Sequence, residues 1–265
     1  MQDKSTSTVP SMLYDETYFL NACEGYTEFL SSEGEYLSRR LAEALSVAGI
    51  APGMEILDVG CGRGEILLHV QRLGGRAHGI DYATVAVQLS HQVSERESGE
   101  QINIYQANAQ QLPFTHKRFD RILMLDIVEH LYPEELDTAL SEAYRVLKPG
   151  GRIVVHTAPN VWYDRYAYPV VRQVRRLLGQ GETYPKNPRA FLVEANVHVH
   201  VNEQSLLSLR RNLRRAGFRE LKVWLSTPPQ HRQENPFFRL VRYLLFNVPP
   251  FRWFFQREVF AVGKR

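Results

Sequence analysis

The chain has 265 residues and a net charge of +3, with 44% hydrophobic and 23% charged residues. These are ordinary globular values, and the length suits one large domain or one domain with appendages. The N-terminus does not read as a secretory signal, and no run of about 18 uncharged apolar residues predicts a spanning helix. Cys23 and Cys61 form no metal-ligand spacing and no disulfide framework, so we expect a reducing, cytoplasmic location.

The N-terminal 35 residues are expected to form a tail and a short helical segment. Residues 1–11 are polar, whereas residues 12–34 carry many aromatic side chains. Three of them, Tyr14, Tyr18 and Phe19, could form a lid over a binding site, and ordinary packing in the core is the alternative. Residues 36–48 have apolar residues at helical spacing and are followed by Gly49, which is typical of the end of a helix.

Strands and helices then alternate along the chain. The pattern predicts strands over residues 54–59, 77–81, 102–107, 119–125 and 152–157, and helices over 66–73, 85–97 and 134–147. Such alternation implies parallel crossovers and therefore a doubly wound α/β sheet.

This rhythm breaks beyond residue 158. Insertions are expected at about 160–202, with one helix near 170–178, and at 228–255, with an apolar segment at 237–246. A helix over 203–216 and strands over 218–225 and 258–263 complete the pattern. We expect residues 36–265 to form one domain that carries both insertions.

The first predicted strand runs into glycines at every second position. Asp58 is followed by Gly60, Gly62 and Gly64, and a helix begins directly afterwards. Glycines allow a backbone to approach a ligand, and ligands of open α/β sheets bind at the carboxyl ends of the strands. Glu65 occupies the position at which a dinucleotide-binding motif needs its last glycine, and no phosphate loop is present. Glu65 suits a cationic ligand or, alternatively, the start of the helix.

In this segment and in four later ones the chain resembles the class I S-adenosylmethionine-dependent methyltransferases. The later segments are residues 78–82, 107–114, 119–126 and 145–151, in the family's order. The resemblance implies that Asp81 accepts the ribose hydroxyls and that Asn108, where the family usually has Asp, contacts adenine. The cofactor-binding residues that it implies are Asp58, Gly60, Cys61, Gly62, Gly64, Asp81, Tyr82, Asn108, Ala109 and Asp126.

The resemblance also implies a fold and a reaction. The fold is a Rossmann-like, seven-stranded, mostly parallel sheet whose last two strands are antiparallel. The reaction is methyl transfer from S-adenosylmethionine, with S-adenosylhomocysteine as product, to an oxygen of a small or lipophilic acceptor. A non-catalytic S-adenosylmethionine-binding or assembly protein is the alternative, because no clear base is present. Glu65 disfavours a nicotinamide-dependent oxidoreductase.

His130 is the candidate general base, because it follows the fourth predicted strand and histidine titrates near neutral pH. A structural role is the alternative. The segment Asp126, Glu129 and His130 also resembles the acidic segment of ubiquinone-pathway O-methyltransferases, some of which bind a divalent metal, although nothing else in the sequence supports a metal. Val and His alternate over residues 197–202, which predicts an extended segment with His198 and His200 on one side. That side faces either the acceptor, which makes His200 a second candidate, or solvent.

Charge divides the chain into two halves. Residues 1–160 carry 13 basic and 22 acidic residues, whereas residues 161–265 carry 19 basic and 7 acidic ones. Arginines beside apolar and aromatic residues in 165–178 and 237–255 are typical of helices at a membrane interface. We therefore expect an anionic membrane surface as a partner, with a lipid-linked acceptor. Packing in the core or in a homodimer is the alternative. No nucleic acid is expected, because no reader motif is present.

Overall fold

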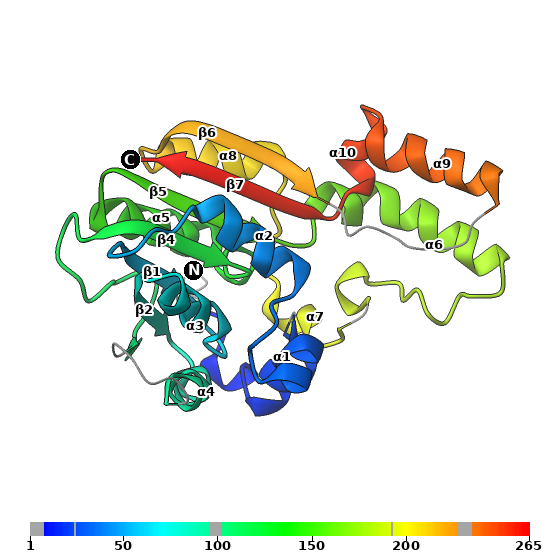
Figure 1. Cartoon of the computed structure of the whole chain (residues 1–265). Helices are drawn as coiled ribbons and strands as arrows, with labels where there is room; N and C mark the ends of the chain where they lie inside the picture. Colours follow the sequence, from blue (N-terminus) through cyan, green and yellow to red (C-terminus); the bar gives the residue numbers. More distant parts are fainter. Residues whose placement is uncertain (1–7, 24, 96–101, 192, 227–234) are drawn as a thin grey trace, which may run out of the picture.

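The computed structural model describes residues 8–23, 25–95, 102–191, 193–226 and 235–265. Parts of the predicted tail and of the 228–255 insertion lie outside these residues. A seven-stranded sheet in the order β3-β2-β1-β4-β5-β7-β6 forms the centre of the described chain (Figure 1). The strands from β3 to β5 are parallel, and β7 runs antiparallel to both β5 and β6. This confirms the predicted doubly wound sheet and its antiparallel last pair.

The bounds of the strands follow the predicted apolar runs to within one or two residues, except that β5 begins at Leu147, five residues before the predicted start, because Leu147 already pairs with Phe119 of β4. The strands are β1 (Glu55–Val59), β2 (Arg76–Asp81), β3 (Asn103–Gln106), β4 (Phe119–Leu125), β5 (Leu147–Thr157), β6 (Arg219–Ser226) and β7 (Glu258–Lys264). The longer helices are α1 (Tyr26–Ser32), α2 (Arg39–Ala48), α3 (Glu65–Arg72), α4 (Thr84–Ser94), α5 (Pro133–Val146), α6 (Tyr168–Leu177), α8 (Leu206–Arg215) and α9 (Pro236–Asn247). The short helical turns are η1 (Ser11–Leu13), η2 (Tyr18–Ala22), η3 (Val128–His130), η4 (Tyr163–Ala167), η5 (Pro188–Ala190), α7 (Asn196–Val199) and α10 (Phe251–Phe255).

The core lies on both faces of the sheet. Because successive side chains of a strand point to opposite faces, Ile56 packs with α2 and α3, whereas Leu57 packs with α5 and α8. Leu123 and Ile122 divide in the same way on β4. Burial on both faces explains why the central strands are apolar runs rather than alternating ones.

Two parts of the chain lie outside these layers. The N-terminal segment η1–η2 packs against α4, where Tyr14, Tyr18 and Phe19 share a cluster of buried residues with Ala86 and Leu89. At the other end, α6, α9 and α10 project beyond the sheet (Figure 1). The helices α9 and α10 form the connection between β6 and β7, so the last two strands are not a tight hairpin. Among the described residues, no helix is both long and apolar enough to cross a membrane.

The prediction of an extended segment over residues 197–202 is wrong. The structure has the helical turn α7 instead, and the His200 N–H donates to the carbonyl of Asn196 (3.0 Å). This turn buries Val199 against the N-terminal cluster, and that packing outweighs the strand preference of alternating valines. His198 is therefore exposed and His200 buried, so the two do not share a side.

The start of α3 provides a test of the backbone. Gly64 has a φ of +86°, and a Cβ added there would lie 2.9 Å from the Cα of Ser90 on α4. Gly64→Ala must therefore push α4 away as well as strain its own backbone. Gly53 is the matched control, because its φ is +80° and nothing lies within 4 Å of its added Cβ.

We expect Gly53→Ala to lower the free energy of unfolding by about 1–2 kcal/mol, the cost of the left-handed conformation alone. Gly64→Ala should cost about 1–3 kcal/mol more. Urea denaturation of both variants measures the difference. Equal losses would show that α3 and α4 are not packed as described.

Candidate functional site

The candidate site is a cavity at the carboxyl ends of β1, β2 and β4. Its empty volume is about 1080 Å³, including the part that is open to solvent. The predicted cofactor residues that line it are Asp58, Gly60, Cys61, Gly62, Asp81, Tyr82, Asn108, Ala109 and Asp126. Gly64 is not among the lining residues, because it lies against Ser90. His130 lines the cavity and His200 does not.

The glycine-rich turn is built from backbone contacts between β1 and β2. The N–H groups of Gly60 and Cys61 both donate to the carbonyl of Ile80 (2.8 and 2.9 Å). Gly60 has a φ of +79°, and a Cβ added there would lie 3.0 Å from Ile127 after β4. A side chain at this position would therefore disturb the loop that follows β4, so the turn needs glycine for space as well as for φ.

Two buried carboxylates, those of Asp58 and Asp81, face the cavity. Asp81 accepts hydrogen bonds from the backbone N–H groups of Ala83 (2.9 Å) and Gly62 (3.2 Å), and burial raises its pKa to about 6. Asp58 is 3% exposed. Burial and the nearby charges of Glu65 and Asp81 raise its pKa to about 8. These two acids would be stabilised by a ligand that brings a positive charge or hydroxyl donors.

The N-terminal segment closes the cavity from outside. Tyr14, Tyr18 and Phe19 line it and are buried. The hydroxyl of Tyr82, after β2, donates to the carbonyl of Val9 (2.9 Å). We call residues 8–23 the lid because their aromatic side chains line the cavity; that they open and close it stays a prediction.

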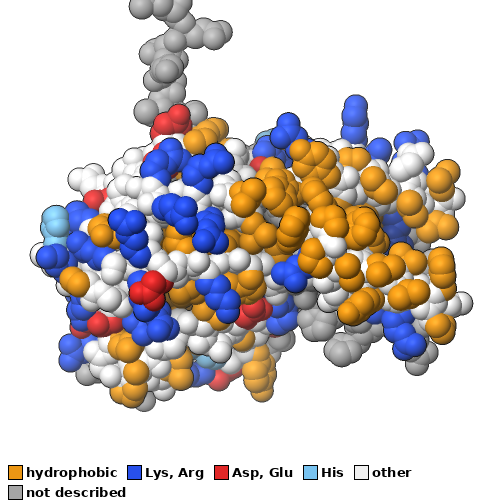
Figure 2. All heavy atoms as spheres, turned by 90° about the horizontal axis from the view of Figure 1, so that it is seen from above, with side chains coloured by type: hydrophobic (Ala, Val, Ile, Leu, Met, Phe, Trp, Pro, Cys, Tyr) orange, Lys and Arg blue, Asp and Glu red, His pale blue; other side chains and the backbone are white. Residues whose placement is uncertain are grey.

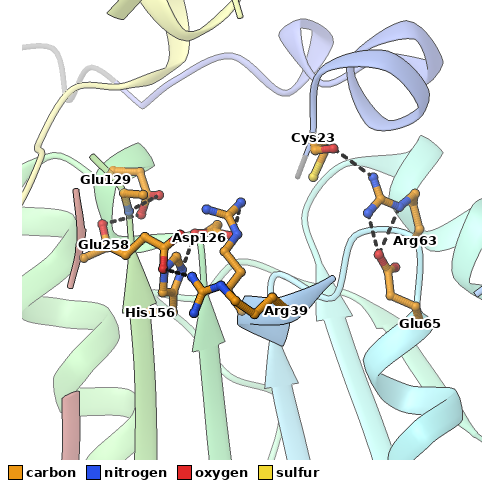
Figure 3. A network of polar contacts seen from close by, with 11 residues as sticks. Cys23, Arg39, Arg63, Glu65, Asp126, Glu129, His156 and Glu258 are labelled. Carbon is orange, nitrogen blue, oxygen red and sulfur yellow. Dashed lines mark hydrogen bonds and ion pairs between the residues drawn. The ribbon is translucent and has the colours of Figure 1, made fainter. Parts of the chain in front are cut away.

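Arg63 holds the lid to the glycine-rich turn. Its Nη1 donates to the carbonyls of Phe19 (2.7 Å) and Cys23 (3.3 Å), and its Nε donates to Glu65 (3.1 Å), which also pairs with its Nη2 (Figure 3). Both side chains of this ion pair are almost fully buried. Glu65 is the first residue of α3, and its charge is balanced by Arg63. It is therefore not available solely to a cationic ligand. The sequence gives no sign of this, because the carbonyls that Arg63 binds lie 40 and 44 positions away.

Asp126 follows β4 and is held by an arginine and a histidine. It lies 3.0 Å from Arg40 of α2 and 2.6 Å from Nδ1 of His156 on β5 (Figure 3). Burial disfavours its charge, but Arg40 and His156 outweigh that effect and lower its pKa below the ordinary value. The contacts of Arg40 and His156 with Asp126 were not predicted, because the sequence patterns of α2 and β5 indicate only which residues face the core.

Glu129 lies on the other side of this network. Its carboxylate accepts hydrogen bonds from the hydroxyl of Thr157 at the end of β5 (2.8 Å) and from the backbone N–H of Ala158 (3.4 Å). Burial and the charge of Asp126 raise the pKa of Glu129.

His130 joins the lid to the floor of the cavity. Its Nδ1 lies 2.9 Å from the hydroxyl of Tyr14, and its ring also hydrogen-bonds the backbone of Val199. Burial, followed by the neighbouring His200, lowers the pKa of His130 to about 3, so the ring is neutral at physiological pH. A neutral imidazole is the form that can accept a proton, but Tyr14 occupies the nitrogen that faces the lid.

His200 lies behind His130 rather than in the cavity. The two rings are 4.9 Å apart and perpendicular, and burial lowers the pKa of His200 to about 4. The described residues bring together ligand atoms of Glu129, His130 and His200, all within 4.8 Å of one another. This group differs from the predicted set, because Asp126 is paired with Arg40 and His156 and does not belong to it.

Comparison with known proteins adds the following. Residues 57–155 match a family model described as a methyltransferase domain. The ubiquinone/menaquinone biosynthesis C-methyltransferase UbiE of Rhizobium leguminosarum is 30% identical over 179 residues, 63% of this chain. The chain spans 65% of the length of that relative.

Solved structures share the fold. A SAM-dependent methyltransferase of Archaeoglobus fulgidus matches with a TM-score of 0.56 and 20% identity, over 90% of this chain and 99% of that one. Phosphoethanolamine N-methyltransferase 2 of Haemonchus contortus, solved with S-adenosyl-L-methionine, matches with a TM-score of 0.61 and 17% identity, over 93% and 59%. At these identities the match shows a common architecture.

Arg63 allows the closure of the lid to be tested. Arg63→Met removes the donors to Phe19 and Cys23 and leaves the buried Glu65 without its partner, which typically costs about 3–5 kcal/mol. In the double variant Arg63→Met/Glu65→Gln the unpaired buried charge is gone, but the contacts from Arg63 to the lid are still missing. We expect both variants to be cleaved by chymotrypsin within residues 8–23 at least about tenfold faster than the wild type, and only the double variant to regain stability.

The matched control is Arg76→Met, which breaks an ion pair with Glu55 at the surface and should change stability by less than about 1 kcal/mol. Mass spectrometry of the fragments locates the cuts. Lid cleavage as slow in Arg63→Met as in Arg76→Met would contradict the anchoring role of Arg63.

Proposed function

We propose that the chain binds S-adenosylmethionine in this cavity and transfers its methyl group. Residues 57–155 match a methyltransferase-domain model, and a curated C-methyltransferase is 30% identical over 179 residues, which supports this proposal. One observation carries the proposal. Asp58 and Asp81 are buried carboxylates that face a cavity closed by aromatic side chains. Such a cavity suits a molecule that is cationic at one end and carries ribose hydroxyls and an aromatic base at the other.

Each wall of the cavity fits one part of that molecule. Asp81 would accept the ribose hydroxyls, and Asp58 would lie toward the positive charges. Gly60 and Gly62 let the backbone approach. Asn108 accepts the N–H of Gln110 through its side-chain oxygen (2.8 Å), which shapes the loop that would contact adenine. When bound, S-adenosylmethionine supplies an electrophilic methyl group that a nucleophile displaces in line.

The acceptor that we propose is a small or lipophilic molecule with an acidic hydroxyl, methylated on oxygen. His130 is the group that would receive the hydroxyl proton, since it is neutral and lines the cavity. Its Nδ1 would have to exchange the Tyr14 hydroxyl for that of the acceptor. Methylation on carbon is the second candidate, because the curated relative is a C-methyltransferase. Both outcomes start from the same ionised hydroxyl if the acceptor is a phenol, whose negative charge is shared by oxygen and ring carbons.

The two outcomes can be separated by product analysis. The protein is incubated with ¹³C-methyl-labelled S-adenosylmethionine and a panel of hydroquinones with and without an isoprenoid tail. The chemical shift of the labelled carbon distinguishes a methoxy from a ring methyl group. Binding of the donor without any labelled product, in this panel and in cell extracts, would favour the non-catalytic alternative.

The donor site is tested at Asp81. Asp81→Asn keeps the shape but removes an acceptor and the charge, so the affinity for S-adenosylhomocysteine should fall about 10- to 100-fold, or about 1–3 kcal/mol. Because the pKa of Asp81 is raised to about 6, the carboxyl is protonated below that pH. Wild-type affinity should therefore fall as the pH drops through 6, whereas the variant should change little there.

Calorimetry measures both effects, and Asp137→Asn on α5 is the control because that residue pairs with Arg215 and does not line the cavity. If Asp81→Asn bound as tightly as the control, the carboxylate would have no part in holding the donor. Tight binding of NAD by the wild type would argue against the proposed donor itself.

The role of His130 is tested by turnover. If it receives the proton, His130→Ala should lower the rate about 100-fold while the affinity for S-adenosylhomocysteine stays within a few-fold. The lowered pKa of about 3 predicts no loss of rate near pH 6.5, where an ordinary histidine becomes protonated. Tyr14→Phe frees Nδ1 and should not lower the rate to the same extent.

His198→Ala is the control, because His198 is exposed on α7. A chelator is added in parallel. Loss of activity with the chelator and its return with zinc or another transition-metal ion would assign Glu129, His130 and His200 to a metal site instead. A rate within a few-fold of wild type in His130→Ala would leave His130 a structural role only.

A further inference from the structure

Exposed apolar side chains are concentrated on the projecting helices. More than half of the large hydrophobic residues that are exposed in the described part of the chain lie on α6, α9 and α10 or at their ends. Leu177 is 79% exposed, Phe237 65% and Leu240 56%. Figure 2 shows a broad hydrophobic area at the end of the molecule where the helices project. We call this area the apolar face.

The three helices form one body. The ring centroids of Phe246 on α9 and Phe255 on α10 are 6.1 Å apart. Those of Phe254 on α10 and Tyr166, just before α6, are 5.7 Å apart. Asn160, just after β5, donates through Nδ2 to the carbonyls of Trp253 (2.9 Å) and Gln256 (3.0 Å). The apolar face is thus fixed to the end of β5, the edge of the sheet at which the cavity lies.

The charged residues within the three helices all have one sign. The sequences of α6, α9 and α10 contain six arginines and no Asp or Glu: Arg172, Arg175, Arg176, Arg239, Arg242 and Arg252. Two of them contact neutral groups, since Arg172 donates to the carbonyl of Tyr184 (3.1 Å) and Arg175 to the side-chain oxygen of Gln180 (2.8 Å). These contacts orient the guanidinium groups without neutralising them.

We propose that the apolar face docks on an anionic lipid bilayer. A second copy of the chain fits less well, because a twofold interface would bring each set of arginines against its own copy. A bilayer with acidic headgroups offers apolar depth and negative charge together. Tyr243 and Trp253 are exposed on the apolar face, and such side chains are enriched at membrane interfaces. The helix α9 has 12 residues, about 18 Å, so it would lie in the interface rather than span the bilayer.

This docking does not rest on methyl transfer, and its test does not use activity. The full-length protein is sedimented with vesicles of phosphatidylcholine alone and of phosphatidylcholine mixed with phosphatidylglycerol. We expect binding to the mixed vesicles only, and partial release at high salt, because screening weakens surface attraction. Leu177→Glu and Leu240→Glu should each weaken binding at least about tenfold. Arg239→Ala should weaken it about fivefold.

The matched control is Leu207→Glu on α8, whose side chain is 58% exposed outside the three helices and which should bind as the wild type does. Circular dichroism verifies that each variant is folded. Wild-type protein that stays in the supernatant with both vesicle types would overturn the proposal. So would equal binding to both types, or leucine variants that bind as well as the control.

Light scattering distinguishes the other occupant. A wild-type dimer that Leu240→Glu converts to a monomer would assign the apolar face to a second copy of the chain. The lipid surface is supported if the wild type and Leu240→Glu have the same mass in solution and only the wild type binds the mixed vesicles.

Discussion

The site depends on how the negative charges of five buried or partly buried carboxyl groups at one edge of the sheet are balanced. Asp58, Glu65, Asp81, Asp126 and Glu129 all lie at or just beyond the carboxyl ends of β1, β2 and β4. Charges removed from water need partners or must be neutralised by protons. Arg63 compensates Glu65, and Arg40 with His156 compensates Asp126. For Asp58 and Asp81, burial raises the pKa, and these are the two acids that a cationic, hydroxyl-bearing donor would stabilise.

The same compensation ties distant parts of the chain to the site. Arg63 joins the glycine-rich turn to the lid, and Arg40 joins α2 to the end of β4. Breaking the first pair would leave the buried carboxylate of Glu65 without a cation, which is costly, and breaking the second would leave Asp126 with His156 alone. The lid is therefore positioned by electrostatics as well as by its aromatic packing. His130 takes part through Tyr14, so its environment changes whenever the lid moves.

The sequence predicts the sheet and the glycine-rich turn well, because both are local patterns. Apolar runs buried on two faces mark β1 and β4, and glycines at every second position mark the turn. The partners of Arg63 and Asp126 could not be predicted, since they come from elements far along the chain. Residues 197–202 mislead for a related reason. Their alternation favours a strand, but burial of Val199 against the lid selects a helical turn. The exposure of Leu177 and Leu240 likewise depends on packing that a periodic pattern does not reveal.

Hydrogen exchange with and without S-adenosylhomocysteine tests the central claim most directly. If the lid and the strand ends form one donor site, the ligand should slow exchange together in residues 58–65, 81–83, 107–110 and the lid. Exchange on α9 should stay unchanged, because that helix does not line the cavity. The account would be contradicted if saturating ligand slowed exchange in none of these segments, or mainly in other parts of the chain.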